Sequence, residues 1–228
     1  GFSYFTEMSD IINRLEDHVA SARMKTTPVI DFEKNESLKG LDYLDTIYHA
    51  IVNEHPIQLK YRSFKARSAN SFIFYPYLLK EYRNRWFVYG VRGNGRILQN
   101  LALDRIQSLE VLPQEHYIKN TFFDPNTFFD DLVGVTKNTG SVAEKVGFKV
   151  AAAEAPYIIT KPIHRSQQVM ERLADGSVIL EIEVVINHEL ERVFFGYAEG
   201  IQVLYPKTLV ELMGRKLKKA AEQYTHSK

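Results

Sequence analysis

Hydrophobic residues recur along this chain at spacings that change from segment to segment, and each spacing predicts an element. In residues 3–25 the apolar side chains repeat at roughly helical intervals, which predicts an amphipathic helix that ends before Pro28. Residues 41–52 carry the same spacing and predict a second helix. From Ile57 to Phe64 apolar and polar residues alternate, which predicts a half-buried strand.

Four more strands are predicted before residue 113. They cover residues 72–80, 85–91, 97–102 and 106–112. Proline has no N–H for a β-ladder, so Pro76 places the first of these strands at a sheet edge or marks a bulge in it. Residues 93–96, Gly-Asn-Gly-Arg, separate the two middle strands and predict a hairpin turn. Five short strands after one helix predict a small barrel of the SH3 or Sm type.

The segment after the fifth strand carries four phenylalanines and is followed by small polar residues. Pro125, next to Asp124, predicts the start of a helix within the Phe-rich residues 122–135. Residues 136–141 are rich in Gly, Thr, Asn and Ser, which predicts a domain boundary. We therefore expect a connecting helix in residues 1–30, a barrel domain with flanking helices in 31–138, and a second domain in 139–228.

The predicted second domain has a different order of strands and helices. They are a strand at 146–151, a short helix at 152–159, strands at 166–173 and 178–186, a helix between Asn187 and Gly200, a strand at 201–205 and a final helix that reaches Tyr224. Asp175-Gly176 predicts a hairpin turn, and Asn187 is a favourable N-cap. The order βαββαβ plus a helix predicts a ferredoxin-like sandwich. The fold class is therefore α+β, a small SH3- or Sm-like barrel followed by a ferredoxin-like domain, with an N-terminal helix.

The amino-acid composition and motifs exclude several kinds of functional site. Hydrophobic residues make up 45% and charged residues 25% of the 228, as in an ordinary globular protein, and cysteine is absent. Disulfides and thiolate metal sites are thereby excluded, and we expect a cytoplasmic protein. The seven histidines lack metal-ligand spacing, and neither a P-loop nor a Gly-x-Ser-x-Gly elbow occurs. We expect no enzyme activity, no catalytic residues, no metal and no cofactor.

The net charge of +1 conceals a strongly basic segment. Residues 57–106 contain ten Lys or Arg and two acids, a net charge of +8, and ten aromatic residues. Interleaved basic and aromatic residues are typical of surfaces that bind nucleotides or single strands. A solvated basic face above an aromatic core has the same composition, so both interpretations stay open.

Nine residues of this segment are candidates for binding an anionic ligand: Tyr61, Arg62, Tyr77, Arg85, Trp86, Tyr89, Arg92, Arg96 and Arg105. A guanidinium group grips a phosphate with two hydrogen bonds, although Arg105 could instead form an ion pair with Asp104. Trp86 could stack on a base or fill the barrel core. Tyr61 and Tyr77 combine an apolar ring with a polar hydroxyl, which suits the rim of a pocket. The remaining arginines contribute to the local electrostatic field.

Four short motifs, taken in order, resemble the WYL domain family. They are Leu59-Lys60-Tyr61, Pro76-Tyr77-Leu78-Leu79, the signature position Trp86-Phe87-Val88, and Leu103-Asp104-Arg105-Ile106. The second half resembles the family's C-terminal extension, WCX, through Gln167, the Asp175-Gly176 hairpin, the helix ending in Gly200 and Ile201–Pro206. Gln99 and Ala102 stand where many members have arginines. Phe87 replaces the signature tyrosine, for which Tyr89 could supply a hydroxyl.

The resemblance implies the ligand-sensing and oligomerising part of a bacterial transcriptional regulator. Its ligand would be an anionic nucleic acid or nucleotide-like molecule. In such proteins a winged-helix DNA-binding domain precedes the pair, so we expect this chain to be a C-terminal fragment that contacts DNA through a domain outside it. We expect a homodimer without membrane contact. The alternative is a ligand-free scaffold for protein interaction and dimerisation.

Overall fold

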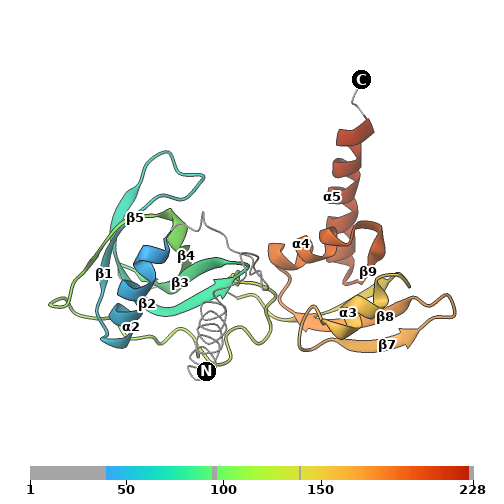
Figure 1. Ribbon diagram of the computed structural model, residues 1–228, viewed down its shortest axis with the longest axis horizontal. Helices are drawn as coiled ribbons and strands as arrows, with labels where there is room; N and C mark the ends of the chain where they lie inside the picture. The colour runs from blue at the N-terminus through green and yellow to red at the C-terminus, as the bar shows by residue number, and fades with distance from the viewer. Residues whose placement is uncertain (1–39, 94–96, 139, 226–228) are drawn as a thin grey trace, which may run out of the picture. The chain divides into compact units, whose positions relative to one another are not determined.

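A computed structural model describes residues 40–93, 97–138 and 140–225, which belong to one compact unit spanning residues 38–228 (Figure 1). The predicted helix at 3–25 and the candidate Arg96 lie outside the described residues. The described residues form two antiparallel sheets with a few helices, so the mixed α+β class is confirmed.

The first sheet contains the five predicted strands. Its elements are η1 (Leu41–Tyr43), α2 (Leu44–Val52), β1 (Ile57–Tyr61), β2 (Asn70–Tyr82), β3 (Arg85–Arg92), β4 (Leu98–Ala102), η2 (Leu103–Arg105) and β5 (Ile106–Val111). The strand order is β4-β3-β2-β1-β5, and all neighbours are antiparallel. The alternation in β1 buries Ile57, Leu59 and Tyr61, as the sequence predicted.

The predicted closed barrel is not found in the described part of the chain. β4 and β5 stand at the two ends of the strand order and are joined through η2 rather than through a ladder of hydrogen bonds. Pro76 lies in β2, an interior strand, so the edge alternative is wrong. The register shifts between Pro76 and Leu78, which confirms the bulge. A bulge lets the long β2 bend without a proline N–H in the ladder.

One face of the first sheet packs against α2. Ile47 and Ala50 of the helix meet Leu59, Phe74 and Val88 of the strands in a buried cluster. Figure 1 shows α2 lying next to these strands. Because side chains alternate along a strand, Tyr89 points to the opposite face from Val88.

The predicted helix within residues 122–135 is absent, and the segment forms turns instead. Side chains satisfy the backbone locally: the Asn120 carboxamide bonds to the backbone of Phe122 and Phe123, and Asp124 accepts from the backbone N–H of Asn126 at 2.9 Å. Such turns of Asn and Asp compete with helix formation. The four phenylalanine rings of this segment pack on Tyr77 and Tyr89 of the first sheet, and three of them also contact one another.

The second sheet has the predicted order of elements. They are β6 (Glu144–Val150), α3 (Ala155–Thr160), β7 (Gln168–Arg172), β8 (Val178–Val184), α4 (His188–Gly196), η3 (Ala198–Gly200), β9 (Ile201–Tyr205) and α5 (Lys207–Thr225). The strand order is β7-β8-β6-β9, antiparallel throughout. The helix after Asn187 thus ends at Gly196, and a separate 3-10 turn reaches Gly200. The name ferredoxin-like and the domain limits stay predictions.

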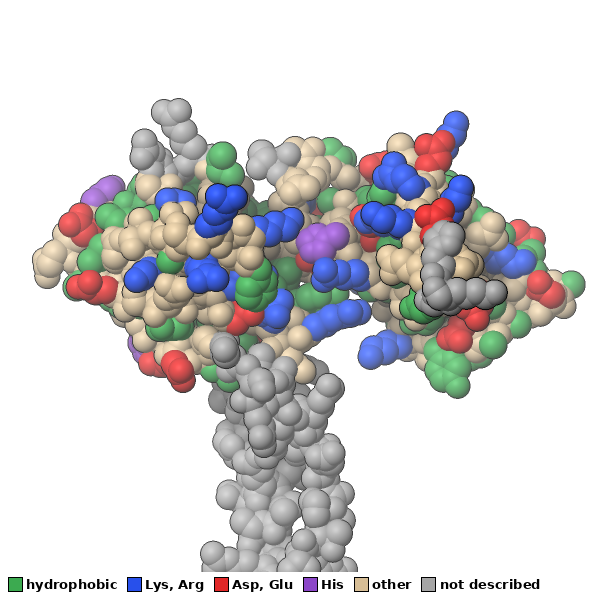
Figure 2. All heavy atoms as spheres, turned by 90° about the horizontal axis from the view of Figure 1, so that it is seen from above, with side chains coloured by type: hydrophobic (Ala, Val, Ile, Leu, Met, Phe, Trp, Pro, Cys, Tyr) green, Lys and Arg blue, Asp and Glu red, His purple; other side chains and the backbone are tan. Residues whose placement is uncertain are grey.

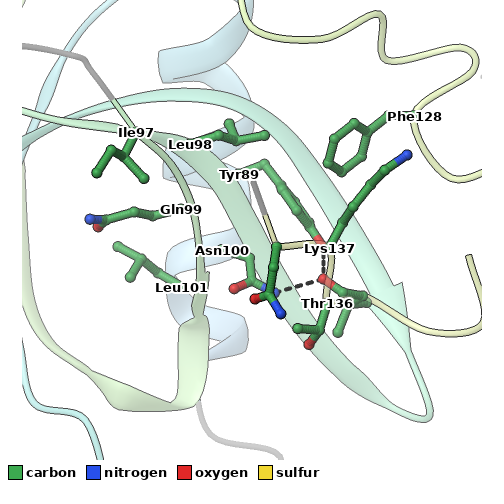
Figure 3. A pocket seen from close by; sticks show the side chains of 11 residues that line it. Tyr89, Ile97, Leu98, Gln99, Asn100, Leu101, Phe128, Thr136 and Lys137 are labelled. Carbon is green, nitrogen blue, oxygen red and sulfur yellow. Dashed lines mark hydrogen bonds between the residues drawn. The ribbon is translucent and has the colours of Figure 1, made fainter. Parts of the chain in front are cut away.

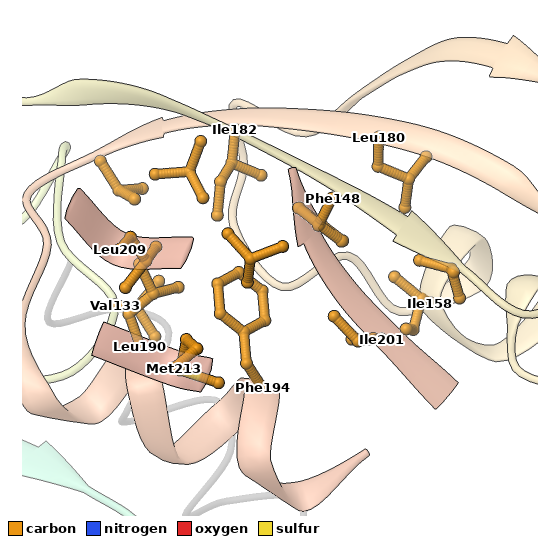
Figure 4. Packing of buried hydrophobic residues seen from close by; sticks show 14 of the residues in the cluster. Val133, Phe148, Ile158, Leu180, Ile182, Leu190, Phe194, Ile201, Leu209 and Met213 are labelled. Carbon is orange, nitrogen blue, oxygen red and sulfur yellow. The ribbon is translucent and has the colours of Figure 1, made fainter. Parts of the chain in front are cut away.

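The core of the second sheet lies between its strands and its helices. The rings of Phe148 in β6 and Phe194 in α4 are 5.1 Å apart at its centre, with Leu180 and Met213 also buried (Figure 4). The backbone N–H of Leu190 donates to the Asn187 carboxamide oxygen at 2.9 Å, so the predicted N-cap is confirmed.

We predict that Gly90→Ala destabilises the protein, because a Cβ at this position of β3 would lie 2.1 Å from the Tyr75 carbonyl oxygen and 2.6 Å from the Phe74 ring. Overpacking of this kind lowers the free energy of unfolding by about 1–3 kcal/mol or more. The matched control is Gly214→Ala in α5, where nothing lies within 4 Å. It should raise stability by about 0.5–1 kcal/mol. Urea denaturation measures both, and equal midpoints for Gly90→Ala and wild type would contradict the β2–β3 packing.

Candidate functional site

Two guanidinium groups and one carboxylate meet where β3 begins and η2 ends. Arg85 Nε lies 3.3 Å from Asp104 Oδ2, and Arg105 Nε lies 3.9 Å from Asp104 Oδ1. Asp104 Oδ1 and Arg105 Nε are both buried and make no hydrogen bond within the described structure. Asp104 therefore places two arginines side by side and neutralises only one of the two positive charges.

Two rings complete this group. The Arg105 guanidinium carbon lies 4.4 Å from the centre of the Phe64 ring, and that ring is 73% exposed. Burial raises the pKa of Tyr61, and the nearby Arg105 guanidinium offsets part of the rise. We call Tyr61, Phe64, Arg85, Asp104 and Arg105 the arginine cluster. It combines charge, a free aromatic face and a hydroxyl, which are the groups that hold a phosphate or a base.

The structure places the other basic candidates around this cluster or away from it. Arg62 is exposed, and its backbone N–H donates to the Arg105 carbonyl at 3.1 Å. Trp86 is half-buried and packs against the α2 core. Arg92 lies at the far end of β3 from Arg85 and stacks on Phe72 at 4.1 Å. The sequence did not distinguish the two ends of this strand.

Tyr77 and Tyr89 do not reach the arginine cluster surface. Tyr77 is buried against Tyr117 and Phe122 of the connecting segment. Tyr89 is buried against Phe128 and its neighbours, at a ring separation of 5.8 Å. Both side chains are buried under the segment that follows β5, so the pocket rim predicted for Tyr77 does not fit its position.

Residues 131–137, which we call the strap, follow the Phe-rich turns and join the two sheets. On the side of the first sheet, the Tyr89 hydroxyl and the Asn100 carboxamide both donate to the Val135 carbonyl, the latter at 2.7 Å. Figure 3 shows the two side chains converging on this oxygen. A single backbone acceptor therefore fixes the strap to β3 and β4.

The start of α4 holds the other side of the strap. The Asn187 carboxamide nitrogen donates to the carbonyls of Val133 and Thr136 at 2.9 and 3.0 Å. The Thr136 hydroxyl donates to Glu189 at 2.8 Å, and this glutamate is only 5% exposed. Gly134 has φ +94°, and a Cβ there would come within 2.5 Å of Glu189. Glycine thus permits both the turn and the close approach of the helix.

A hollow of about 330 Å³ lies between β4 and the strap (Figure 3). It is lined by Tyr89, Ile97, Leu98, Gln99, Asn100, Leu101, Phe128, Val135, Thr136, Lys137 and Asn138. Of these residues the sequence singled out Tyr89 and Gln99, but it did not predict the hollow. The only signal was the run of polar residues after Val135, which predicted a boundary rather than a wall.

Neither a metal-binding cluster nor a membrane-spanning helix is found among the described residues. No group of three or more His, Asp or Glu side chains there could hold a metal ion. Within the same residues, no helix combines the length and apolar character needed to cross a membrane.

These features define an α+β protein of two antiparallel sheets, with a cationic, ring-bearing cluster on the first sheet. The chain is a WYL domain protein: the WYL domain family matches residues 42–111, and the WCX domain family matches residues 143–221. The resemblance seen in the four motifs is therefore confirmed. The arginine cluster lies in the WYL part, and α4 lies in the WCX part.

Two solved structures are similar to this chain. Proteasome accessory factor B/C (PafBC) of Arthrobacter aurescens has 16% sequence identity and a TM-score of 0.38, over 90% of this chain and 30% of that one. A CRISPR Cas-related protein has 13% identity and a TM-score of 0.46, over 79% of this chain and 50% of that one. This chain thus spans half or less of either protein. No curated protein sequence matches it.

Two substitutions at Asn187 should separate its two tasks. Asn187→Ser keeps a capping oxygen but leaves the Val133 and Thr136 carbonyls without their donor, so we expect a loss of about 1–2 kcal/mol. Asn187→Ala also removes the cap and should cost about 1 kcal/mol more. Urea denaturation of the full chain measures both. A serine variant as stable as wild type would show that the strap bonds contribute nothing.

The protein should lose stability between about pH 10 and pH 12. Burial raises the pKa of Tyr77 from 10.0 to about 12, and burial also raises the pKa of Tyr89 and Tyr117. In this range the unfolded chain releases phenolic protons that the folded protein retains. Each unit by which the pKa in the folded state exceeds that in the unfolded state therefore lowers the free energy of unfolding by about 1.4 kcal/mol. Tyr77→Phe should flatten the dependence, measured as urea midpoint against pH. Tyr224→Phe, at a side chain that is 85% exposed, is the control. An unchanged slope in Tyr77→Phe would contradict the assignment.

Proposed function

We propose that the arginine cluster binds an anionic nucleic acid or nucleotide-like ligand, and that this chain is the sensing and oligomerising part of a bacterial transcriptional regulator. The observation that carries the proposal is the stacking of Arg105 on the exposed Phe64 ring, beside the second guanidinium of Arg85. An anion would bind the guanidinium groups, and a base would extend the stack on Phe64.

The charges around the cluster support an anionic ligand. Arg62, Lys65 and Arg67 are exposed in the loop after β1, which leads directly from Tyr61. In Figure 2, the body that holds β1–β5, on the left, shows several Lys and Arg side chains among hydrophobic ones on the face turned to the viewer. A concentration of one sign of charge attracts a phosphate-bearing ligand before contact.

Sensing requires a path from the ligand to the rest of the regulator. η2 carries Arg105 and follows β4 without a break, and Asn100 of β4 donates to the strap. A ligand that moved Arg105 would therefore act on the strand whose side chain holds the domain connection. DNA binding would lie with a domain outside this chain, and we propose a homodimer as the working unit.

The alternative function is a ligand-free scaffold for protein interaction and dimerisation. One observation favours it: the apolar stripe of α5 continues beyond the core through Leu217, which is 43% exposed, to Tyr224, which is 85% exposed. A stripe of this kind is suited to contact with another protein. A stable dimer by light scattering, together with no binding of nucleotides or oligonucleotides, would favour this function.

Binding of a fluorescently labelled single-stranded DNA oligonucleotide tests the anionic site. We expect Arg105→Ala to weaken binding about 10- to 100-fold, because a hydrogen bond to a charged group contributes about 1.5–3 kcal/mol. Arg85→Ala should have a smaller effect, because Asp104 already neutralises part of its charge. Affinity should fall as salt rises from about 50 to 200 mM.

Two arginines serve as controls for this experiment. Arg172→Ala removes an exposed arginine of β7 in the second sheet, and Arg92→Ala removes the one at the far end of β3. Both should retain wild-type affinity within about twofold, since surface charges away from a site contribute little. Equal losses in all four variants, or binding that ignores salt, would reject the arginine cluster as the site.

A further inference from the structure

The last helix, α5, has a packed first half and an exposed second half. Leu209 and Met213 of the first half are buried in the core of the second sheet. Every residue from 214 to 225 is exposed, and Figure 1 shows the helix extending past the other elements of that sheet. We call residues 214–225 the free end of α5. Isolated helices below about 12–15 residues are marginal in water, so the free end gains stability from a segment that covers it.

One row of apolar side chains in α5 has the spacing of a coiled-coil seam. Its members follow one another at intervals of three, four, three and four residues, from Val210 through Met213, Leu217 and Ala220 to Tyr224. These are the a and d positions of a heptad, which form a narrow apolar stripe that fits one facing helix. Val210 and Met213 pack in the core, whereas Leu217 and Tyr224 are exposed. The seam therefore continues out of the core along the free end.

Small residues beside the seam leave room for a partner helix to come close. Gly214 and Ala221 occupy the e positions, directly next to the seam on one side. No atom lies within 4 Å of a Cβ placed at Gly214. Because the distance between two packed helices depends on the side chains at their contact, small residues here permit a short one.

Positive charge surrounds the seam. The free end carries four Lys or Arg and one Glu, a net charge of +3. Lys216 is paired with Glu191 of α4, whereas Arg215, Lys218 and Lys219 form no ion pair with a residue that the structure describes. Successive residues are about 100° apart around a helix, so Lys218 and Lys219 lie on opposite sides of the seam. A partner with acidic side chains on both sides of its own apolar stripe therefore matches this surface.

We propose that the free end of α5 docks an acidic amphipathic helix of a partner protein, through a two-helix seam centred on Leu217. A second copy of α5 fits less well, because its net charge of +3 would face the same charge. A DNA backbone would use the cations but leave Leu217 and Tyr224 in water, and exposed apolar surface of this kind marks protein contacts. The surface is separate from the proposed anionic site, because no residue of the arginine cluster lies in α5.

Binding of labelled helical peptides to the full chain, followed by fluorescence anisotropy, tests the surface. One peptide of about three heptads has leucine at a and d and glutamate at e and g, and a second has lysine in place of glutamate. Repulsion between like charges keeps each peptide from pairing with itself. We expect the glutamate peptide to bind at least about tenfold more tightly at about 50 mM salt, and the difference to shrink at about 500 mM. No binding of the glutamate peptide at millimolar concentration, or equal binding of the two, overturns the proposal.

Matched variants assign the binding to the seam. Leu217→Ser should weaken binding of the glutamate peptide at least about tenfold, because it removes the apolar side chain at the centre of the seam. Val169→Ser, at a similarly exposed apolar residue of β7, should have no effect. The double variant Lys218→Glu, Lys219→Glu should weaken binding, whereas Lys207→Glu in the first turn of the same helix should not. Binding that survives Leu217→Ser, or that falls equally with Val169→Ser, overturns the proposal.

Further measurements with the same variants distinguish the other occupants. Light scattering should give the same mass for wild type and Leu217→Ser, and loss of a dimer in the variant would assign the seam to a second copy and overturn the proposal. Duplex DNA binding that falls with Lys218→Glu, Lys219→Glu, without any binding of the glutamate peptide, would assign the free end to nucleic acid and overturn it as well. Arg105→Ala should leave peptide binding unchanged, and Leu217→Ser should leave oligonucleotide binding unchanged, so failure of one site is distinguishable from failure of the other.

Discussion

Buried carbonyl groups of the strap are the constraint on which the domain connection depends. A buried backbone oxygen that lacks a donor costs about 1–3 kcal/mol. Val133, Val135 and Thr136 all find their donors on side chains rather than in a helix or sheet: Tyr89 and Asn100 on one side, and Asn187 on the other. Side chains from the first sheet and from the start of α4 therefore fix the course of the connecting segment.

The first sheet uses its two faces for different purposes. The face with Val88 packs on α2, and the arginine cluster stands at its rim. The face with Tyr89 is covered by phenylalanine rings and by the strap. The Tyr89 hydroxyl, which would be exposed on an open sheet, thereby becomes a donor to the connection. One sheet therefore carries the arginine cluster at its rim and, on its other face, the hydrogen bonds to the strap.

Local patterns predicted most strands and the Asn187 cap, because alternation and capping depend on neighbours within a few residues. Local patterns did not predict how segments far apart in the sequence pack against each other. The apolar and aromatic residues of β3 predicted a strand, but they could not show that residues more than 30 positions later cover the face that carries Tyr89. Arg85 and Arg92 looked equivalent because both flank the same strand, yet seven residues of extended chain separate them by about 23 Å. Pro125 next to Asp124 predicted a helix in the Phe-rich segment, whose rings pack instead as a group on Tyr77 and Tyr89 of the sheet.

β4 links the strap to the arginine cluster through Asn100 and through η2. Its residues Leu98–Leu101 line the hollow, Asn100 holds the strap, and the chain then passes through η2 to Arg105 within five residues. Energetic coupling between sites requires a contiguous set of packed or hydrogen-bonded groups, and this strand provides one. The pairing of β4 with only one neighbour leaves it less restrained than an interior strand. An end strand that holds the domain connection through Asn100 and continues through η2 to Arg105 is therefore the shortest path in this fold from the arginine cluster to the second domain.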